Sequence, residues 1–348
     1  MFKGVEYPVC TISKTRIDRA GYKLSHPLAS HEQEDIDGAI DIINNFRAAH
    51  NYPLLIFRLD LADKVRRIDV TATVAQRLKR LPSIEAKLRR LSTRLTQMEA
   101  IGGCRAVVRS VRMVHRLANK YKRSKMGHQN LHIVDYVKEP RDTGYRGIHL
   151  IYAYQSQSKP QYNGLKIEIQ LRSRSQHAWA TAVETVDAFA QRSLKDGTAD
   201  AKWQRFFALM ATFIAIREGC NPVPNTPTDP MLLNNEIRSL ASELNVIQLL
   251  ESYKATLNFE GIPGARFYLL QLDSSKGQTL LRGFKKDEFE QAEQLYLSTE
   301  KELFGQHGKD AVLVSEGSLG SLKRAYPNYF ADTNVFIEIL SEAIFAAS

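Results

Sequence analysis

The sequence predicts an α/β fold, in which a mixed sheet carries flanking helices, joined to a smaller C-terminal α+β domain. Short β-branched runs alternate with amphipathic stretches, and a proline-rich segment at which the net charge changes sign divides the chain. At 348 residues the chain is long enough for two or three domains. Its 43% hydrophobic and 25% charged residues are typical of globular proteins, which excludes global disorder.

The spacing of apolar residues predicts the elements that precede the proline-rich segment. Helical spacing predicts helices over 33–49, 52–67, 83–98 and near 111–122. Runs of β-branched residues predict strands at 104–110, 131–137, 147–155 and 165–173. A long helix is expected to begin near Arg174, and a second to end near Gly219. The strands therefore form the middle of this region, with helices on either side.

Residues 221–230, NPVPNTPTDP, contain four prolines and form the clearest linker. They predict a domain boundary. An N-terminal helical region (1–68) and a central domain (69–220) precede it, and a C-terminal domain (231–348) follows it. In the last we expect a helix over 231–257, a hairpin of 265–273 with 278–284 that turns at 274–277, and a helix over 287–304. Strands are expected at 311–315 and 335–340.

The cations are unevenly distributed. The chain has a net charge of +10, of which residues 1–225 contribute +16 and residues 226–348 contribute −6. Between Arg77 and Lys125 there are 15 Lys and Arg residues but only two acids, Glu85 and Glu99. A solvated helix face is the common explanation of such a run, but ordinary surfaces mix both signs. We interpret it as a contact for polyphosphate or nucleic acid.

Two further segments carry polar residues in a pattern that suits a binding site. In 167–172, Glu168, Gln170 and Arg172 alternate with apolar residues and share one strand face, and His177 and Glu184 share a face of the next helix. The turn at 142–149 places Tyr145 between two glycines, where its ring could stack on a base. An ordinary half-exposed strand, a core histidine and a loop tyrosine are the structural alternatives.

Four segments together resemble the RelA/SpoT nucleotide pyrophosphokinase family: RLKRLPSIEAK (77–87), GGCR (102–105), DYVKEPRDTGYRGIH (135–149) and EIQLRSRSQHAWATAVE (168–184). The resemblance covers roughly residues 70–190 and implies a nucleotidyltransferase-like synthetase domain. It also implies that the β,γ-pyrophosphate of ATP moves onto a ribose 3′-hydroxyl. Positioning, cations and a metal held by a carboxylate suit this type of transfer.

The resemblance implies roles for individual residues. The adenine of ATP would lie between Arg77 and Arg105, and the phosphates would be held by Lys79, Ser83, Lys87 and Arg172. The acceptor would be bound by Tyr145, whose ring stacks on its base, together with Arg146 and His149. Glu168 would assist the attacking hydroxyl and hold Mg²⁺, and Gln170 and His177 would complete the catalytic pocket.

Position 100 departs from the family pattern. The family has an acidic Mg²⁺ ligand five residues before the arginine of its G-x-R motif, and here that position is Ala100. Glu99 is adjacent, but one step along the chain points its side chain elsewhere. Either the chain is a weakly active, inactive or merely nucleotide-binding form, or an aspartate was replaced to make a toxic enzyme tolerable. The other motifs are intact, which favours the second explanation.

The segments 13–25 and 177–184 further resemble the toxic small synthetases, particularly the fused toxin–antitoxin group called CapRel. This resemblance implies that the tRNA 3′ CCA end is the acceptor and that the C-terminal domain restrains the enzyme until a phage major capsid protein binds. It also implies that a Tyr-x-x-Tyr segment, here Tyr326 and Tyr329, blocks the ATP pocket. Synthesis of the alarmone (p)ppGpp from GTP or GDP is the alternative activity.

We expect a cytoplasmic monomer. The N-terminus lacks a signal pattern, and no stretch approaches the roughly 18 apolar residues of a membrane span. Cys10, Cys104 and Cys220 are isolated and odd in number, so no disulfide framework is expected.

Overall fold

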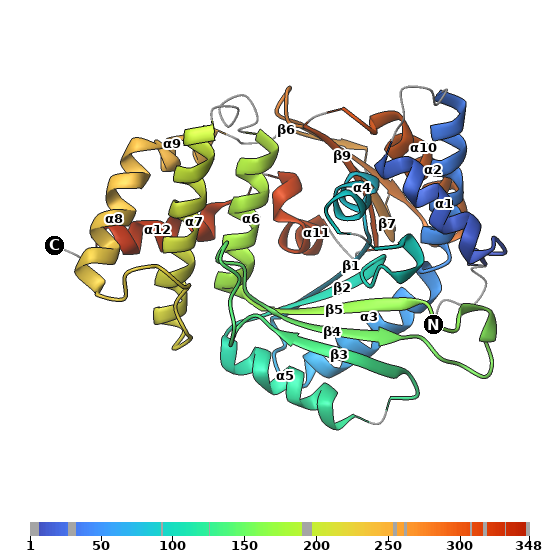
Figure 1. Ribbon diagram of the computed structural model, residues 1–348, viewed down its shortest axis with the longest axis horizontal. Coiled ribbons are helices and arrows are strands. Elements are labelled where there is room, and N and C mark those ends of the chain that lie inside the picture. Colours follow the sequence, from blue (N-terminus) through green and yellow to red (C-terminus); the bar gives the residue numbers. More distant parts are fainter. Residues whose placement is uncertain are drawn as a thin grey trace.

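The computed structural model describes residues 7–26, 33–91, 93–124, 126–189, 197–252, 256–260, 263–306, 308–315, 319–330 and 332–345. Two sheets lie beside each other, and helices surround both of them (Figure 1). The first sheet is mixed and five-stranded, with the order β1-β2-β5-β4-β3. The expected α/β fold with an additional C-terminal α+β region is therefore confirmed.

The first sheet brings together strands that are far apart in the sequence. Its strands are β1 (Thr73–Leu78), β2 (Gly102–Val108), β3 (Gln129–Asp135), β4 (Ile148–Ala153) and β5 (Lys166–Ser173). β2 and β5 are parallel, whereas β1–β2, β3–β4 and β4–β5 are antiparallel. The register pairs Arg105 with Ala75 on one side and with Gln170 on the other, so three strands meet at the arginine.

The two faces of this sheet differ. Along β5, Ile167, Ile169 and Leu171 are fully buried against α3 (Asn51–Arg66) and α5 (Val111–Arg123). The intervening residues Glu168 and Gln170 are only partly buried and point to the opposite face. That face is approached by α6 (Arg174–Phe189) and by C-terminal elements.

Two groups of helices complete the fold. The first contains α1 (Lys14–Ser25), α2 (Gln33–Ala48) and α4 (Leu81–Arg90), which share one apolar cluster. The second contains α6, α7 (Gly197–Arg217), α8 (Pro230–Glu243), α9 (Val246–Ser252) and α12 (Asn334–Phe345). Their common core extends from Trp179 to Ala343, so packing is continuous across the proline-rich segment 221–230.

The second sheet has the order β6-β8-β7-β9. Its strands are β6 (Thr256–Glu260), β7 (Phe267–Asp273), β8 (Gln278–Phe284) and β9 (Lys309–Ser315). β7 and β8 form the expected hairpin, with Gly277 at a φ of 59° in the turn. α10 (Phe289–Leu303) covers one face, and α11 (Leu319–Ala325) with the short helix Pro327–Phe330 leads to the first sheet.

Three predicted elements are wrong or incomplete. The helix expected over 83–98 ends at Arg90, where three cations in the last turn complement the helix dipole and a serine and a threonine follow. The helix expected over 231–257 breaks at Asn245, which has a positive φ of 49°. The strand expected at 335–340 is part of α12, whose buried residues Phe336, Ile339, Leu340 and Ala343 follow helical spacing.

None of the helices in the described part of the chain is both long and apolar enough to cross a membrane.

Candidate active site

The polar face of β5 carries a closed ring of hydrogen-bonded side chains. Arg172 donates from Nη2 to the Tyr145 hydroxyl over 2.9 Å and to Gln170 Oε1 over 3.1 Å. The Tyr145 hydroxyl lies 2.6 Å from His149 Nε2, and His149 Nδ1 lies 2.8 Å from Glu168 Oε1. Gln170 closes the ring by donating to Glu168 Oε2 over 2.6 Å.

The ring has one consistent direction of hydrogen bonding. Arg172 only donates and an ionised Glu168 only accepts, so both arms run from the guanidinium to the carboxylate. In either protonation state His149 Nδ1 donates to Glu168, and in the neutral tautomer that fits the ring Nε2 accepts from Tyr145. Burial opposes ionisation of Glu168, but the hydrogen bond and charge of His149, the Gln170 amide and Lys79 lower its pKa to about 2. The carboxylate is therefore anionic at neutral pH.

A small cavity of about 80 Å³ opens beside Glu168. It is lined by Ala75, Gln76, Arg77, Lys79, Arg80, Ser83, Ala100, Gly103, Cys104, Arg105, Glu168, Gln170 and Tyr326. We call this the donor cavity. Six of the residues predicted to bind ATP or to catalyse the transfer line it, namely Arg77, Lys79, Ser83, Arg105, Glu168 and Gln170. Nucleotide-sized sites occupy roughly 300–1,000 Å³, so the donor cavity as it stands is too small for ATP.

Positive charge is concentrated around the donor cavity. Burial and the neighbouring Lys87 lower the pKa of Lys79 to about 8. Burial, Arg172 and Arg77 lower the pKa of Arg105 to about 10. Because these cations disfavour one another's charge, an anion placed among them would be stabilised. Glu184 on α6 partly meets this demand: burial opposes its ionisation, but Arg77, Arg80, Arg105 and Arg172 lower its pKa.

The chain end of α11 occupies one wall of the donor cavity. Arg105 donates from Nη2 to the main-chain oxygen of Ala325 over 2.6 Å. The Tyr326 hydroxyl accepts from the amide of Gln76 over 3.1 Å and donates to the carbonyl oxygen of the same residue. Tyr326 is only 1% exposed, and it packs together with Ala75 in the core of the second sheet. Tyr326 therefore hydrogen-bonds to the β1 backbone at the outer edge of the first sheet.

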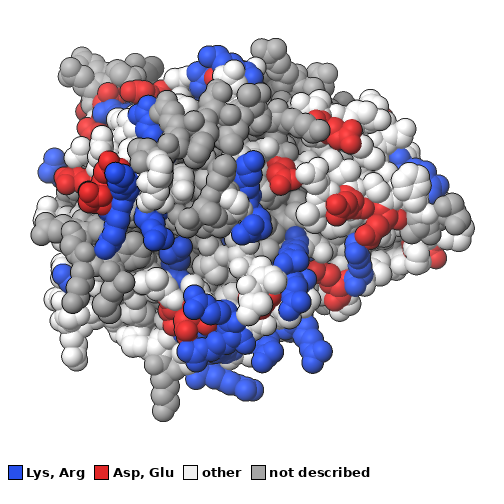
Figure 2. Space-filling view, turned by 180° about the vertical axis from the view of Figure 1, so that it is seen from behind, with Lys and Arg blue, Asp and Glu red and all other residues white. Residues whose placement is uncertain are grey.

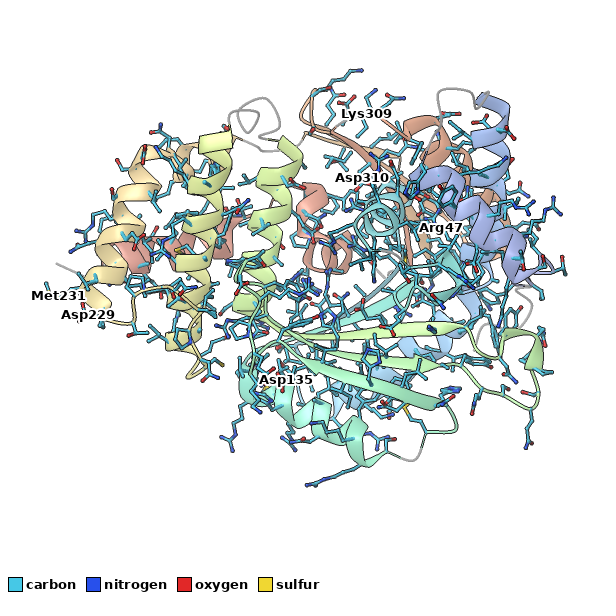
Figure 3. All side chains as sticks on the ribbon, viewed as in Figure 1. Arg47, Asp135, Asp229, Met231, Lys309 and Asp310 are labelled. Carbon is cyan, nitrogen blue, oxygen red and sulfur yellow. The ribbon has the colours of Figure 1, made fainter. Side chains whose placement is uncertain are left out.

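Tyr329 does not line the donor cavity but is linked through Asp310 to Arg80, which does. Its hydroxyl donates to Asp310 Oδ2 over 2.6 Å, and the same oxygen forms an ion pair with Arg80. Asp310 and Arg47 mark the contact between the second sheet and the N-terminal half of the molecule (Figure 3). Arg47 is fully buried and pairs with Glu300 of α10 over 2.6 Å. The pair of Arg80 with Asp310 joins the start of α4 to β9, and the pair of Arg47 with Glu300 joins α2 to α10.

A second cavity lies at the other side of Tyr145. It measures about 490 Å³ and is lined by Arg141, Asp142, Thr143, Tyr145, Trp179, Val183, Val186, Asp187, Trp203, Gln204 and Phe207. We call it the acceptor cavity. Gly144, at a φ of 92°, lies so close to α7 that a Cβ atom would meet Ala211 at 2.6 Å, which seats the loop before β4. The cavity is large enough for a nucleoside.

Five predicted catalytic or binding residues line neither cavity: His149 and Arg172, which belong to the ring, and Arg146, Lys87 and His177. Arg146 is 3% exposed and donates to the carbonyl oxygens of Val137 and Asn221, so it fixes the loop that holds Tyr145. Lys87 lies near enough to Lys79 to lower its pKa but does not line the donor cavity. His177 lines a separate cavity with Arg324 of α11, and burial with Arg105 and Arg172 lowers its pKa well below its ordinary value.

The donor cavity offers one carboxylate to a metal. Glu168 lines it, Ala100 adds only a methyl group, and Glu99 instead lies 3.3 Å from His132 Nε2, outside the cavity. Mg²⁺ in nucleotide sites is held by one or two carboxylates together with substrate phosphates. Glu168 therefore fits as a ligand, and position 100 would hold a second one if it were acidic.

Sequence reasoning missed Arg80, Asp310 and Arg141. Arg80 lies within the basic run, but its partner Asp310 is 230 residues away in the sequence. Arg141 lies 4.5 Å from the ring centroid of Tyr136 and 5.7 Å from that of Tyr145. A cation four residues before a candidate stacking tyrosine was the only available signal.

An α/β fold with a polar strand face, a basic cavity and a tyrosine-bearing loop characterises the chain. Residues 76–188 match the family described as "Region found in RelA / SpoT proteins", so this part of the chain is similar to that family. The matched region contains β2 to β5 and the complete ring. The search of curated protein sequences finds no match.

Three solved structures illustrate the likeness. The small alarmone synthetase 1 from Bacillus subtilis bound to its product pppGpp is 20% identical, with a TM-score of 0.42, over 50% of this chain and 93% of that one. A GTP pyrophosphokinase family protein from Streptococcus pneumoniae is 18% identical, with a TM-score of 0.41, over 58% and 95%. The small alarmone synthetase 2 from B. subtilis is 22% identical, with a TM-score of 0.37, over 48% and 94%.

Proposed function

We propose that the protein is an ATP-dependent pyrophosphotransferase whose acceptor is a ribose 3′-hydroxyl at the 3′ CCA end of tRNA. The observation that carries this proposal is the Glu168 carboxylate between the two cavities. Glu168 lines the basic donor cavity and is hydrogen-bonded through His149 to Tyr145, which lines the acceptor cavity. An attacking hydroxyl and a polyphosphate would therefore meet at one carboxylate.

In the proposed reaction the 3′-oxygen bonds to the β-phosphorus of ATP. The bond from this phosphorus to the oxygen bridging the α- and β-phosphates breaks, and AMP leaves with the bond electrons. Glu168 orients the hydroxyl and accepts its proton as the bond forms, while Lys79 and Arg105 offset the charge on the phosphates. The hydrogen bonds from His149 and Gln170 hold the carboxylate in place.

Mg²⁺ would be held by Glu168 and by the phosphates of ATP, and it would neutralise part of their charge. Ala100 leaves this site with a single protein ligand. We therefore infer that the chain with Ala100 is weakly active or inactive, and that an aspartate at position 100 would provide the missing ligand.

We further propose that the C-terminal region holds the enzyme closed and that a phage protein, such as a major capsid protein, releases it. The small volume of the donor cavity, the bond from Arg105 to Ala325 and the two bonds of Tyr326 to Gln76 support this. Opening would be a population shift, since a partner that binds only the open form favours it. Translation would stop once tRNA 3′ ends are blocked.

The test uses the full chain with Ala100→Asp and Tyr326→Ala, ATP labelled in the γ-phosphate, and tRNA. We expect label on intact tRNA and none on tRNA whose 3′ end has been oxidised. Label in guanosine polyphosphates when GTP or GDP is added would instead establish alarmone synthesis. ATP binding without any transfer in this variant would indicate a nucleotide-binding module without activity.

Removal of residues 226–348 is a poor test. α8, α9 and α12 share one apolar core with α6 and α7, so truncation would expose Phe206 and Phe207 as well as open the donor cavity. Point substitutions separate the two effects.

A further inference from the structure

A second positively charged surface lies on the opposite face of the first sheet. It is a groove of about 770 Å³ between α3 and α5. Its lining consists of Lys64, Arg67, Ile68, Arg112, His115, Arg116, Asn119, Lys120, Arg123 and Ser124. No Asp or Glu is among these lining residues, all of which lie in the described part of the chain. Figure 2 shows Lys and Arg gathered at the lower edge of this side of the molecule.

The cations of α5 form one continuous stripe. Arg112, Arg116, Lys120 and Arg123 recur at three- and four-residue spacing, so they share a helix face, while Val114, Leu117 and Tyr121 face the core. From Arg112 to Arg123 the stripe is roughly 16 Å long at 1.5 Å per residue. This length is sufficient for contact with several phosphates of a duplex.

Helix stability explains only part of this stripe. Lys120 and Arg123 lie in the last turn, where they complement the helix dipole, but Arg112 lies in the first turn, where the dipole disfavours a cation, and like charges four residues apart destabilise a helix. At the end of α3, Lys64 and Arg67 are paired with Asp60 and Asp63. The four cations of the stripe, by contrast, have no carboxylate within ion-pair distance among the residues that the structure describes.

We propose that this α3–α5 groove binds the phosphodiester backbone of RNA. An anionic membrane is the weaker candidate, because a membrane-bound helix needs exposed apolar residues, and those of α5 are buried in the core. The fold also connects the groove to the acceptor cavity. The carboxyl ends of β2 and β5 pair with each other, and β4 begins opposite Leu171, near the end of β5. Because α5 follows β2 and the Tyr145 loop precedes β4, both lie at the same end of the sheet.

None of the described residues of the C-terminal region lines the groove. α3 and α5 cover the face of the sheet opposite to α11, so the closed protein can bind RNA there while its donor cavity is blocked. An RNA held in the groove would extend past the end of the sheet that α5 and the Tyr145 loop share, and its single-stranded end would lie near Tyr145. The inference rests on the proposed function only in the choice of tRNA as the probe.

The experiment measures binding of labelled tRNA, with and without its 3′ CCA, to the full chain over a range of salt concentrations. The variant is Arg112→Ala with Arg116→Ala and Lys120→Ala. The matched control removes three exposed cations elsewhere, Lys202→Ala with Lys276→Ala and Lys285→Ala, and has the same net charge. Arg112→Lys with Arg116→Lys keeps the charge of the groove and checks the fold.

We expect the groove variant to bind at least about tenfold more weakly near 100 mM salt, and to lose two to three units of the slope of log affinity against log salt, at roughly 0.7–0.9 per phosphate contact. The control and the lysine variant should bind like the unchanged chain, and the loss caused by the groove variant should be the same for tRNA with and without its CCA end. Equal losses in the groove and control variants would overturn the proposal, as would stronger binding to vesicles containing phosphatidylserine than to tRNA. Failure of pyrophosphate transfer with intact groove binding would reject the proposed activity alone.

Discussion

The donor and acceptor cavities lie on either side of the ring formed by Tyr145, His149, Glu168, Gln170 and Arg172, yet they differ in state. The donor cavity measures about 80 Å³ and has Tyr326 in its wall. The acceptor cavity measures about 490 Å³, and all of its lining residues lie between positions 141 and 207. Among the described residues, the C-terminal region therefore contributes to the lining of the donor cavity and not to that of the acceptor cavity.

Under the proposed function, this difference would separate control of the reaction from recognition of the acceptor. A restraint on the donor cavity would prevent transfer without hindering acceptor binding, so an acceptor could already be bound when the restraint is released. The Glu168 carboxylate would be the same in the closed and open forms, because its hydrogen bonds to His149 and Gln170 come from the sheet alone. Four predictions test this division, and they are ordered by the size of the expected effect.

The largest effect is expected at the carboxylate that joins the two cavities. Glu168→Gln, in the Ala100→Asp and Tyr326→Ala background, should reduce transfer by about 10²–10⁴-fold, the usual range for loss of a proton acceptor. The measurement is the initial rate of label transfer to tRNA. The control is Glu139→Gln, at an exposed position in the loop between β3 and β4. A reduction smaller than a few-fold would remove Glu168 from the mechanism.

Tyr326→Ala should tighten binding of a non-hydrolysable ATP analogue by about 30-fold, because two hydrogen bonds to Gln76 at roughly 1 kcal/mol each are lost from the closed form. Affinity for a CCA trinucleotide should be unchanged. Calorimetry measures both affinities. Phe330→Ala is the control, since that ring packs in the same cluster without lining the donor cavity. Unchanged ATP affinity in Tyr326→Ala would show that Tyr326 does not close the site.

Asp310→Asn should tighten ATP binding by about tenfold. The substitution leaves Arg80 without its charged partner, which costs the closed form on the order of 1–2 kcal/mol at a partly buried site. The pair Lys202 and Glu243 is exposed, so Glu243→Gln should alter ATP affinity by less than twofold. Equal effects of both substitutions would mean that the contact of β9 with α4 does not hold the closed form.

The smallest effect concerns pH. Burial and the nearby Glu290 raise the pKa of Glu293 to about 7, although Asn51 of α3 donates a hydrogen bond to it. The packed form thus holds the proton more tightly than a separated form, in which the pKa returns toward 4.5. The contribution to closure is complete below pH 4.5 and is lost as pH rises to about 7.

Closure should therefore weaken between pH 6.5 and pH 7.5, and over this interval ATP affinity corrected for the ionisation of ATP should increase about threefold. Glu293→Gln resembles the protonated form and should abolish this dependence. If the dependence persists in Glu293→Gln, another group controls the contact between α10 and α3.

The elements that could be predicted from the sequence are those whose signal is local. The strands β2 to β5 alternate or are rich in β-branched residues, and these predictions are confirmed. β1 was missed because TVAQRL has only Ala75 and Leu78 as buried residues, and its partner β2 begins 24 residues after β1 ends. The run 335–340 was misassigned because a short apolar run does not distinguish a strand from a buried helix.

The same distinction holds at the site. Glu168, Gln170 and Arg172 alternate on one strand, and Tyr145 and His149 are close in sequence, so their proximity followed from spacing and family resemblance. No such signal indicated that Arg146 points away from both cavities and donates to the carbonyl oxygens of Val137 and Asn221. Nor did the pairing of Arg80 with Asp310, since it depends on how two sheets dock.

The apolar core that α6 and α7 share with α12 has a consequence for synthesis of the protein. The ribosome completes β5 long before it reaches Phe336 and Leu340, which fill that core at the far end of the chain. At roughly 5–20 residues per second, the interval lasts several seconds to half a minute. During this time the nascent chain lacks Phe336 and Leu340, which pack in one core with α6, the helix that carries Glu184 and lies beside the Tyr145 loop. The helical support of the polar sheet face and the segment that lines the donor cavity thus become available together. Under the proposed function, the cell making the protein would be spared an early, unrestrained enzyme.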